Sequence, residues 1–227
     1  MAKHAFFVTG TDTGVGKTCI AAGLLQAANS RGLTTAALKP VAAGCERTPE
    51  GLRNEDALLL QSVVNPPLDY EQINPVALEP AIAPHIAALE ARRPLSTDRL
   101  AGYCRGVLGQ ADFTVVEGAG GWRVPLNPAE TLADLARQLN LPVILVVGVR
   151  LGCLNHALLT AEAIARDGLP LAGWVANVLD PDMSRLRENV DALGQRLRAP
   201  FLGWVPTLSS PTPSAVAEHL NLDPLIG

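Results

Sequence analysis

Lysine is scarce in this chain of 227 residues. It occurs only at Lys3, Lys17 and Lys39, and the other fifteen of the eighteen basic residues are arginines. Such a bias follows genome composition and carries no function by itself. The compact ammonium of lysine nevertheless differs from the planar guanidinium of arginine, so a lysine that is retained marks a position where this difference can matter. Lys17 and Lys39 are therefore the first candidates for a functional site.

Long apolar runs, a signal-peptide pattern and cysteines with CxxC spacing are also missing. The longest apolar run, residues 141–149, is far shorter than the roughly 20 residues of a membrane-spanning helix. Lys3 is followed at once by a segment of strand character, which does not resemble a signal peptide. We therefore expect a cytoplasmic protein with no membrane association. Disulfides and zinc are disfavoured because none of the four cysteines has CxxC spacing: Cys19, Cys45, Cys104 and Cys153.

An excess of positive charge is absent too. The formal net charge is −4 and the pI is about 5.6, which disfavours non-specific binding to nucleic acid, so no nucleic-acid partner is expected. Hydrophobic residues make up 48% of the chain, which is ample for a large core. The length suits one domain, and we predict a single domain over residues 1–227.

The most informative motif lies near the N-terminus. An apolar strand, residues 5–9, leads into Gly-Thr-Asp-Thr-Gly-Val-Gly-Lys-Thr at 10–18, and a helical pattern follows. In a P-loop, backbone N–H groups and the helix N-terminus hold phosphates, while the Lys contacts the β- and γ-phosphates and the Thr hydroxyl ligates Mg²⁺. The spacing is imperfect, because Thr11 occupies the place of the first glycine and Gly10 comes one residue early. An ordinary glycine-rich turn is the alternative, but it would not need Lys17 and Thr18.

The pattern of elements predicts an α/β fold with a doubly wound, mainly parallel sheet flanked by helices, of P-loop NTPase type. The Pro-rich stretch 65–84 is expected to be an irregular surface excursion. Ligands of such sheets bind at the carboxyl ends of the strands. Strands are predicted at 5–9, 35–39, 113–117, 143–147, 171–177 and 201–205, and helices at 17–31, 56–63, 82–91, 97–109, 131–139, 154–167, 183–197 and 214–219.

Two further strand ends carry charged residues. Lys39 leaves the second strand just before a proline, and Glu117 ends the third and is followed by glycines. Such a lysine is often a surface residue, but beside a P-loop it is a candidate for the same crevice. Glu117 is where a P-loop enzyme places the acid of its Mg²⁺ site, with helix capping as the alternative. Asp56 opens a predicted helix, and N-capping alone would explain an acid there.

Seven segments, taken in order, resemble the dethiobiotin synthetase family. They are Gly-Thr-Asp-Thr-Gly-Val-Gly-Lys-Thr (10–18), Lys-Pro-Val-Ala (39–42), Gly-Leu-Arg-Asn-Glu-Asp-Ala (51–57), Val-Glu-Gly-Ala-Gly-Gly-Trp (116–122), Pro-Val-Ile-Leu-Val-Val-Gly-Val (142–149), Leu-Gly-Cys-Leu-Asn-His-Ala (151–157) and Ala-Gly-Trp-Val-Ala-Asn (172–177). The resemblance implies an ATP- and Mg²⁺-dependent cyclo-ligase of biotin biosynthesis. Its substrates would be 7,8-diaminononanoate, CO₂ and ATP, and it would be a homodimer with the substrate site near the subunit interface.

The resemblance also implies a course of reaction. CO₂ carbamylates one amine of the diamine, and the carbamate attacks the γ-phosphate of ATP to give a carbamic–phosphoric anhydride. The neighbouring amine then closes the ureido ring and releases phosphate. Such phosphoryl transfer depends mostly on positioning and charge neutralisation, which two lysines and Mg²⁺ can supply.

Family roles transfer to this sequence by position. Lys17 and Lys39 would be catalytic, Asn177 would contact the adenine edge, and Asn155 would lie near the substrate carboxylate, unless it is simply a polar residue at a helix N-terminus. The implied Mg²⁺ ligands are Thr18, Asp56 and Glu117. The implied substrate contacts are Thr11, Lys39, Ala43, Gly120, Gly121 and Asn155. The implied nucleotide contacts are Asp12, Thr13, Gly14, Val15, Gly16, Lys17, Thr18, Cys19, Asp56, Glu117, Gly118, Ala119, Gly120, Asn177, Val205, Pro206 and Thr207.

The sequence departs from the family pattern at three places. Ala43 stands where the family often has a serine that contacts substrate. An acid that often follows a few residues after Thr207 is absent from 208–211, and Asn189 stands near the position of an interface tyrosine. These departures leave open how the nucleotide base and the substrate carboxylate are held.

Three other classes compete with this interpretation. A ParA/MinD-like switch ATPase would carry a second lysine in the loop, where this chain has Asp12. A cobyrinate-type amidotransferase would need a further glutaminase domain, for which 227 residues leave no room. A simple nucleotide-binding module would not explain why Lys39 and Glu117 meet the loop.

Overall fold

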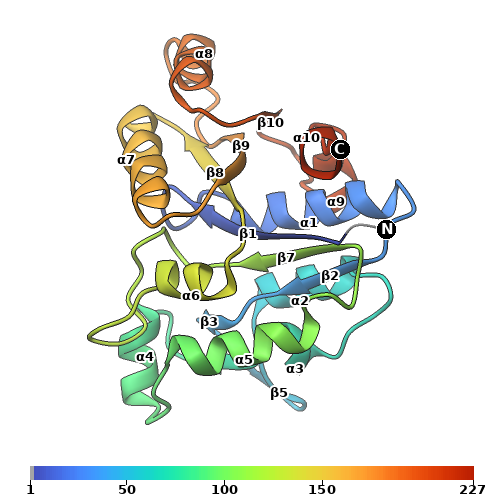
Figure 1. Ribbon diagram of the computed structural model, residues 1–227, viewed down its shortest axis with the longest axis vertical. Helices are drawn as coiled ribbons and strands as arrows, with labels where there is room; N and C mark the ends of the chain where they lie inside the picture. Colours follow the sequence, from blue (N-terminus) through green and yellow to red (C-terminus); the bar gives the residue numbers. More distant parts are fainter. Residues whose placement is uncertain (1–2) are drawn as a thin grey trace.

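The central feature of the computed structural model, which describes residues 3–227, is a six-stranded sheet in the order β10-β9-β8-β1-β7-β2 (Figure 1). All five strand pairings in this sheet are parallel, which confirms the predicted doubly wound α/β class. Strands β7 and β2 lie on one side of β1, and β8 to β10 lie on the other. The strands are β1 (His4–Gly10), β2 (Thr35–Leu38), β7 (Phe113–Glu117), β8 (Val143–Val149), β9 (Leu171–Val178) and β10 (Phe201–Val205).

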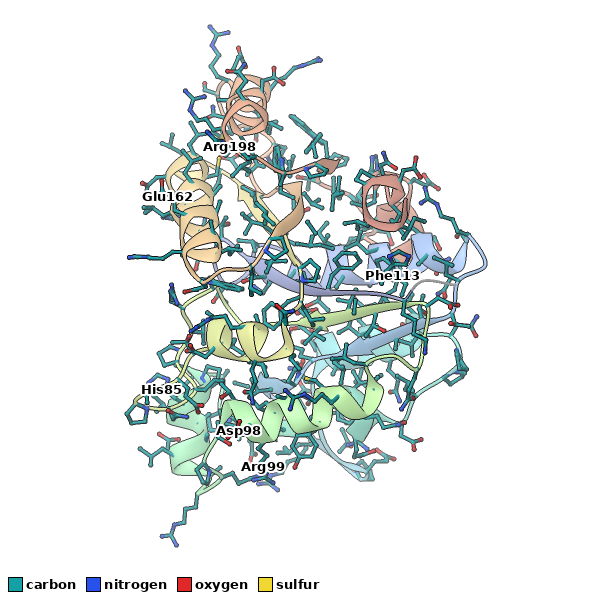
Figure 2. All side chains as sticks on the ribbon, viewed as in Figure 1. His85, Asp98, Arg99, Phe113, Glu162 and Arg198 are labelled. Atoms are coloured by element: carbon teal, nitrogen blue, oxygen red, sulfur yellow. The ribbon has the colours of Figure 1, made fainter. Side chains whose placement is uncertain are left out.

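The strands are apolar on both faces because helices cover the sheet on both sides. Phe6 and Val8 of β1 pack on one face and Phe7 on the other, as period-two alternation requires. Figure 2 shows Phe113 among the interior side chains, and its exposed fraction is 0%. The predicted strands and the helices that connect them are therefore confirmed, with boundaries that differ by no more than a few residues.

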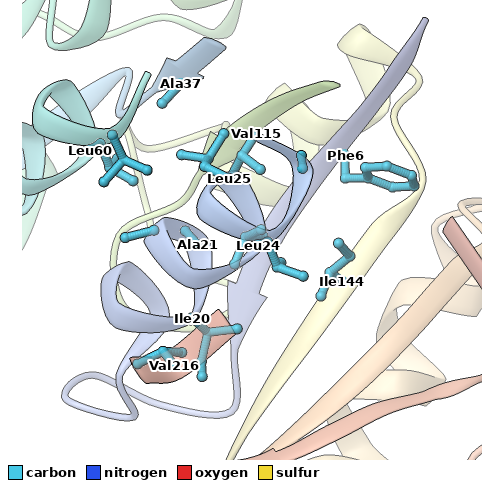
Figure 3. Close-up of a cluster of buried hydrophobic side chains, with 14 of the residues drawn as sticks. Phe6, Ile20, Ala21, Leu24, Leu25, Ala37, Leu60, Val115, Ile144 and Val216 are labelled. Atoms are coloured by element: carbon cyan, nitrogen blue, oxygen red, sulfur yellow. The ribbon is translucent and has the colours of Figure 1, made fainter. Parts of the chain in front are cut away.

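Helix α1 fills the first face (Figure 3). Ile20, Leu24 and Leu25 of this helix pack against strand residues that include Val115 and Ile144. Because α1 follows the P-loop directly, this packing fixes the position of the loop above the sheet. The helices with residues in this cluster are α1 (Lys17–Asn29), α2 (Glu55–Val63), α3 (Tyr70–Ile73), α9 (Pro213–Ala217) and α10 (Asp223–Ile226).

The second face carries two apolar clusters, one over β2, β7 and the start of β8 and the other over the rest of β8 and β9. Trp174 is the largest fully buried side chain in the cluster over β8 and β9, and its ring packs at a tilt against Phe201 with ring centroids 4.5 Å apart. No helix within residues 3–227 is both long enough and apolar enough to cross a membrane. The helices on this face are α4 (Pro84–Glu90), α5 (Thr97–Val107), α6 (Leu132–Leu139), α7 (Cys153–Arg166) and α8 (Leu186–Arg196).

The stretch 65–84 is more ordered than the sequence suggested. It forms helix α3 (Tyr70–Ile73) and strand β6 (Val76–Leu78), which pairs with β3 (Val41–Ala43). Tyr70, Ile73 and Asn74 are buried, so the prediction of an irregular surface excursion is wrong for this part. Short elements separated by prolines carry too few residues for a periodic pattern to stand out. A hairpin of β4 (Glu46–Thr48) and β5 (Gly51–Arg53) was missed for the same reason.

Candidate functional site

The P-loop connects the end of β1 to α1 and presents the open N-terminus of that helix. Gly16 is the N-cap residue with φ 83° and ψ 27°, and no described side chain caps the helix. The first backbone N–H groups of a helix lack intrahelical partners and favour anions. This end of α1 therefore has the donors that a phosphate needs.

Glycine is required at position 16 for two reasons. Its φ lies in the left-handed region, and a β-carbon there would lie 2.3 Å from Nδ2 of Asn177. The same Nδ2 donates a hydrogen bond of 2.9 Å to the carbonyl of Val15. This hydrogen bond ties the end of β9 to the P-loop.

Lys39 connects the ends of β2 and β7 with α2. Its Nζ donates to Asp56 Oδ2 at 2.7 Å and to Glu117 Oε1 at 2.6 Å. The hydroxyl of Thr18 donates to the same Glu117 oxygen at 2.8 Å. Glu117 is 0% exposed and Lys39 is 4% exposed, so this ion pair is buried, whereas the side chain of Asp56 is 45% exposed. The parallel register of β2 and β7 explains why Lys39 and Glu117 meet. Leu38 pairs with Val116, and Lys39 and Glu117 are the residues that come next.

The two lysines have different electrostatic environments. Burial opposes the charge on Lys39, but the nearby carboxylates of Glu117 and Asp56 outweigh it and raise the pKa of Lys39. Burial opposes the charge on Asp56, but the charge and hydrogen bond of Lys39, a hydrogen bond from Thr18 and the charge of Lys17 together lower its pKa. Burial lowers the pKa of Lys17 to about 8, although the carboxylate of Glu117 partly offsets it. The ammonium of Lys17 donates to the Asp12 carbonyl at 3.0 Å.

A cavity of about 830 Å³ lies directly over these groups. Lys17, Lys39, Asp56 and Glu117 all line it, so the residues predicted from separate segments share one site. Its volume suits a nucleotide-sized ligand. Of the predicted site residues, the cavity is lined by Thr13, Gly14, Gly16, Lys17, Thr18, Cys19, Lys39, Ala43, Asp56, Glu117, Ala119 and Gly120.

Other predicted residues lie behind or beside this cavity. The Thr11 hydroxyl accepts from Gly148 N–H at 3.3 Å, and Asp12 forms an ion pair of 2.7 Å with Arg150. Asn155 is exposed in the first turn of α7 and is not among the residues that line the cavity. The remaining predicted residues outside the cavity lining are Val15, Gly118, Gly121, Asn177, Val205, Pro206 and Thr207.

Pro206 and Thr207 line a second, more open groove of about 700 Å³ beside α8. The Thr207 hydroxyl donates to the Val178 carbonyl at 3.2 Å, which ties the loop after β10 to the end of β9. This groove is separate from the cavity over the P-loop.

Part of the cavity wall was not predicted. Ala42 and the segment 81–84 line one side, and Val124 and Pro125 line another. These residues are apolar or small and have no chemical signature in the sequence. The only signal was position, because 81–84 leads into α4, which begins at Pro84, and 124–125 follows the glycines after Glu117.

The residues present fit a magnesium ion. Thr18, Asp56 and Glu117 offer hydroxyl and carboxylate oxygens, which are the ligands that Mg²⁺ prefers. The second Glu117 oxygen, Oε2, is buried and receives no hydrogen bond from any described residue. A buried carboxylate oxygen without a partner is costly, and a cation would satisfy it.

The parallel sheet, the P-loop and the acid at the end of β7 together define a P-loop nucleotide-binding protein. A family model described as an AAA domain matches residues 4–215. The chain is 67% identical over 226 residues to the ATP-dependent dethiobiotin synthetase BioD of Cellvibrio japonicus, which covers 100% of this chain and 99% of the relative. It is also 67% identical over 222 residues to the protein of that name from Pseudomonas aeruginosa strain PAO1, with 97% of each chain covered. The chain therefore belongs to the ATP-dependent dethiobiotin synthetase family.

Solved structures of more distant proteins share the fold. A ParA family ATPase from Chlorobium tepidum TLS matches with a TM-score of 0.58 at 14% identity, covering 96% of this chain and 91% of that one. The septum site-determining protein MinD from Pyrococcus horikoshii OT3, complexed with Mg-ADP, matches with a TM-score of 0.55 at 16% identity, covering 94% and 86%. At these identities the likeness concerns the fold alone. The curated relatives confirm the predicted ligase, whereas nothing but fold connects the chain to the switch ATPases.

Proposed function

We propose that this protein closes the ureido ring of dethiobiotin from 7,8-diaminononanoate, CO₂ and ATP, releasing ADP and phosphate. The observation that carries the proposal is the cluster of Lys17, Lys39 and Glu117 at the P-loop, in a chain 67% identical to an ATP-dependent dethiobiotin synthetase over its full length. A switch ATPase has no need of a buried second lysine from β2, so this cluster favours the ligase.

The reaction needs charges held in place more than it needs new covalent chemistry. An amine of the substrate attacks CO₂ and loses a proton, which gives a carbamate. One carbamate oxygen then attacks the γ-phosphorus as the bond to ADP breaks, and a carbamic–phosphoric anhydride forms. The second amine attacks the carbamoyl carbon, the bond to the phosphate oxygen breaks, and the amine loses a proton as the ring closes. Oriented neighbouring groups make the last step effectively unimolecular.

Lys17 and Lys39 have different roles in the proposed reaction. Lys17 follows the P-loop and would bind the β- and γ-phosphates, whereas Lys39 would hold the carbamate against the phosphoryl group. The two acids that flank Lys39 keep it protonated, because their attraction raises its pKa. A lysine held as a cation can stabilise the negative charge on both reactants throughout the transfer.

Mg²⁺ is the expected metal, with Thr18, Asp56 and Glu117 as its protein ligands. When bound, the ion would neutralise charge on the phosphates of ATP. The four charged side chains of the site, Lys17, Lys39, Asp56 and Glu117, sum to zero, so the protein alone does not balance a triphosphate.

A homodimer is proposed from the surface of α7 and the loop before it. Leu151 is 89% exposed, and the nearby Asn155 is exposed outside the cavity of its own chain. An exposed leucine beside a polar residue with a predicted substrate role suits a surface that meets the site of a second chain. We propose that Asn155 reaches the substrate carboxylate across that interface.

We propose that the nucleotide base lies beside the loop at 205–207 and Asn177, whose amide bonds to the P-loop at the Val15 carbonyl. Cys19, in the first turn of α1, lines the cavity over the P-loop. All four cysteines lie in the described part of the chain as free thiols, which suits the reducing cytoplasm that we propose as its location. The single-domain organisation and the lack of a nucleic-acid partner stay predictions.

Isotope incorporation tests the proposed function directly. The protein is incubated with ¹³C-bicarbonate, ATP, MgCl₂ and 7,8-diaminononanoate, and the products are analysed by mass spectrometry. We expect dethiobiotin with one labelled carbon, formed only when ATP, diamine and Mg²⁺ are all present. Hydrolysis of ATP without a labelled ring product would contradict the proposal.

A further inference from the structure

A buried hydrogen-bond chain starts at the backbone of Lys39. The carbonyl of Lys39 accepts a hydrogen bond of 2.7 Å from Asn74 Nδ2. The Tyr70 hydroxyl donates to Asn74 Oδ1 at 3.0 Å and accepts from the backbone N–H of Asn54 at 2.8 Å. Tyr70, Asn74 and Asn54 are all buried, so each bond is made away from competing water.

The other end of this chain returns to Lys39 through α2. Asn54 is the N-cap of α2, and its Oδ1 accepts from the N–H of Ala57 at 3.3 Å. Asp56 lies two residues after Asn54, in the first turn of the same helix, and its Oδ2 binds Lys39 Nζ at 2.7 Å. The bonds therefore form a closed ring that begins at the backbone of Lys39 and ends at its ammonium.

Helix α3 holds the lysine at a second point. The N–H of Lys39 donates to the carbonyl of Ile73, the last residue of α3, at 2.7 Å. β2 ends at Leu38, so the backbone of Lys39 has left the sheet and depends on α3 for these partners. Tyr70 is the first residue of α3, and Asn74 directly follows the helix. One short helix thus binds both backbone groups of the lysine and the start of α2.

This arrangement controls the position of a flexible side chain. A lysine has many rotamers, and ordering them costs entropy that fixed partners must offset. A shift of about 1 Å in a reacting group can lower a rate by about a hundredfold. The ring sets the distance between the Cα atoms of Lys39 and Asp56, and so sets where the ammonium can rest.

We propose that Tyr70 is a positioning residue of the reaction, which acts through Asn74 on the backbone of Lys39 and through Asn54 on Asp56. The inference rests on the proposed function, because it concerns the same lysine. Tyr70 touches none of the reactants in this account. Its hydroxyl lies between the two segments that carry the ion pair, and its ring is held separately under the guanidinium of Arg53, 4.2 Å from the ring centroid.

The test is Tyr70→Phe, with Tyr103→Phe as the matched control. The chain has two tyrosines, and the exposed Tyr103 bonds only to Arg99 on its own helix among the described residues. We expect Tyr70→Phe to lower kcat for diamine-dependent phosphate release by about ten- to a hundredfold, with ATP binding changed less than about twofold. Tyr103→Phe should match the wild type in both. Amide hydrogen exchange at Lys39 and Asn54 should become faster in Tyr70→Phe alone.

A double-variant cycle separates positioning from general loss of structure. If Tyr70 acts through the Lys39–Asp56 pair, adding Tyr70→Phe to Asp56→Asn should change single-turnover kcat by less than about twofold. Equal effects of Tyr70→Phe in both backgrounds would overturn the proposal, as would a Tyr70→Phe variant with wild-type kcat.

A second variant covers the case in which Tyr70→Phe does not fold. Asn74→Asp keeps an acceptor for the Tyr70 hydroxyl but places a carboxylate oxygen against the Lys39 carbonyl, so it should show the same loss of kcat. Wild-type kcat in Asn74→Asp would then overturn the proposal. A wild-type protein that shows no diamine-dependent turnover would instead contradict the proposed function, so the two failures are distinguishable.

Discussion

At the scale of single residues, the alkylation of Cys19 tests whether ATP binds in the cavity over the P-loop. Cys19 is half-buried, lines this cavity, and has a pKa raised by burial. We expect iodoacetamide to modify Cys19 slowly near neutral pH and faster as the pH rises, since the thiolate is the reactive form. ATP should protect it. Cys104 is the internal comparison, because burial raises its pKa to about 12 and it should stay unmodified in the folded protein. Peptide mass spectrometry with and without ATP makes the measurement, and equal labelling of Cys19 in both would contradict the assigned site.

At the same scale, the carboxylate of Glu130 leads to a prediction of how the stability of the protein depends on pH. The hydrogen bonds that its carboxylate accepts from Thr97 and Asn127 lower its pKa. Its contribution to stability is therefore present above the unfolded value of about 4.3, and it is lost as the pH falls through the lower folded value. Glu130→Gln should reduce the free energy of unfolding at pH 7, and the difference from wild type should shrink below about pH 4.

Urea unfolding at pH 7 and at pH 3.5 checks this prediction. Glu162→Gln is the control, because Glu162 lies on the outer surface of α7 and is exposed (Figure 2). It should behave like the wild type at both pH values. If Glu130→Gln lowers the free energy of unfolding equally at pH 7 and at pH 3.5, the charge of the Glu130 carboxylate is not what stabilises the protein at this position.

The sequence was informative about single residues where chemistry and position agreed. Lys39 follows β2 and Glu117 ends β7, the neighbouring parallel strand, so their meeting could be predicted from the order of elements. The contact of Asp56 with Lys39 could not, because Asp56 arrives on a helix whose packing depends on Tyr70 and Asn74. A tyrosine and an asparagine in a Pro-rich stretch have many structural roles and show no spacing that singles out this one.

Helix α1 is the element on which the site depends most. Leu24 is fully buried between the helix and the sheet (Figure 3). Leu24→Ala should lower the free energy of unfolding by about 2–5 kcal/mol, because it removes packed apolar surface and leaves a cavity. Leu58→Ala is the matched control on α2, where the side chain is exposed, and it should cost less than about 0.5 kcal/mol. Denaturant unfolding measures both, and similar costs would mean that α1 is not packed as described.

Long helices and strands could be predicted because the period of their hydrophobic pattern and the length of the segment both indicated the same element. The six central strands are continuous apolar runs, and helices such as α7 carry enough turns to show a repeat. The short elements α3, β3 and β6 have three or four residues each, and tertiary contacts rather than local pattern decide their structure. The wall of the cavity at 81–84 depends on these short elements, which is why it was not predicted.

The whole molecule is expected to work as a pair of chains. Light scattering after gel filtration should give about twice the chain mass of 23.8 kDa. Leu151→Glu places a charge on the exposed leucine before α7 and should shift the protein toward single chains, with a higher KM for the diamine. ATP binding should be unchanged, since the P-loop belongs to one chain. A wild-type protein that is a single chain and fully active would contradict the shared site.

Phosphate release tests the central claim most directly. It is measured with ATP, Mg²⁺ and bicarbonate, with and without 7,8-diaminononanoate, for the wild type and for Lys39→Ala, and nucleotide binding is measured in both. We predict diamine-dependent turnover in the wild type and a loss of at least about a hundredfold in Lys39→Ala, with nucleotide still bound. Turnover that is indifferent to the diamine, or that survives the loss of Lys39, would contradict the account.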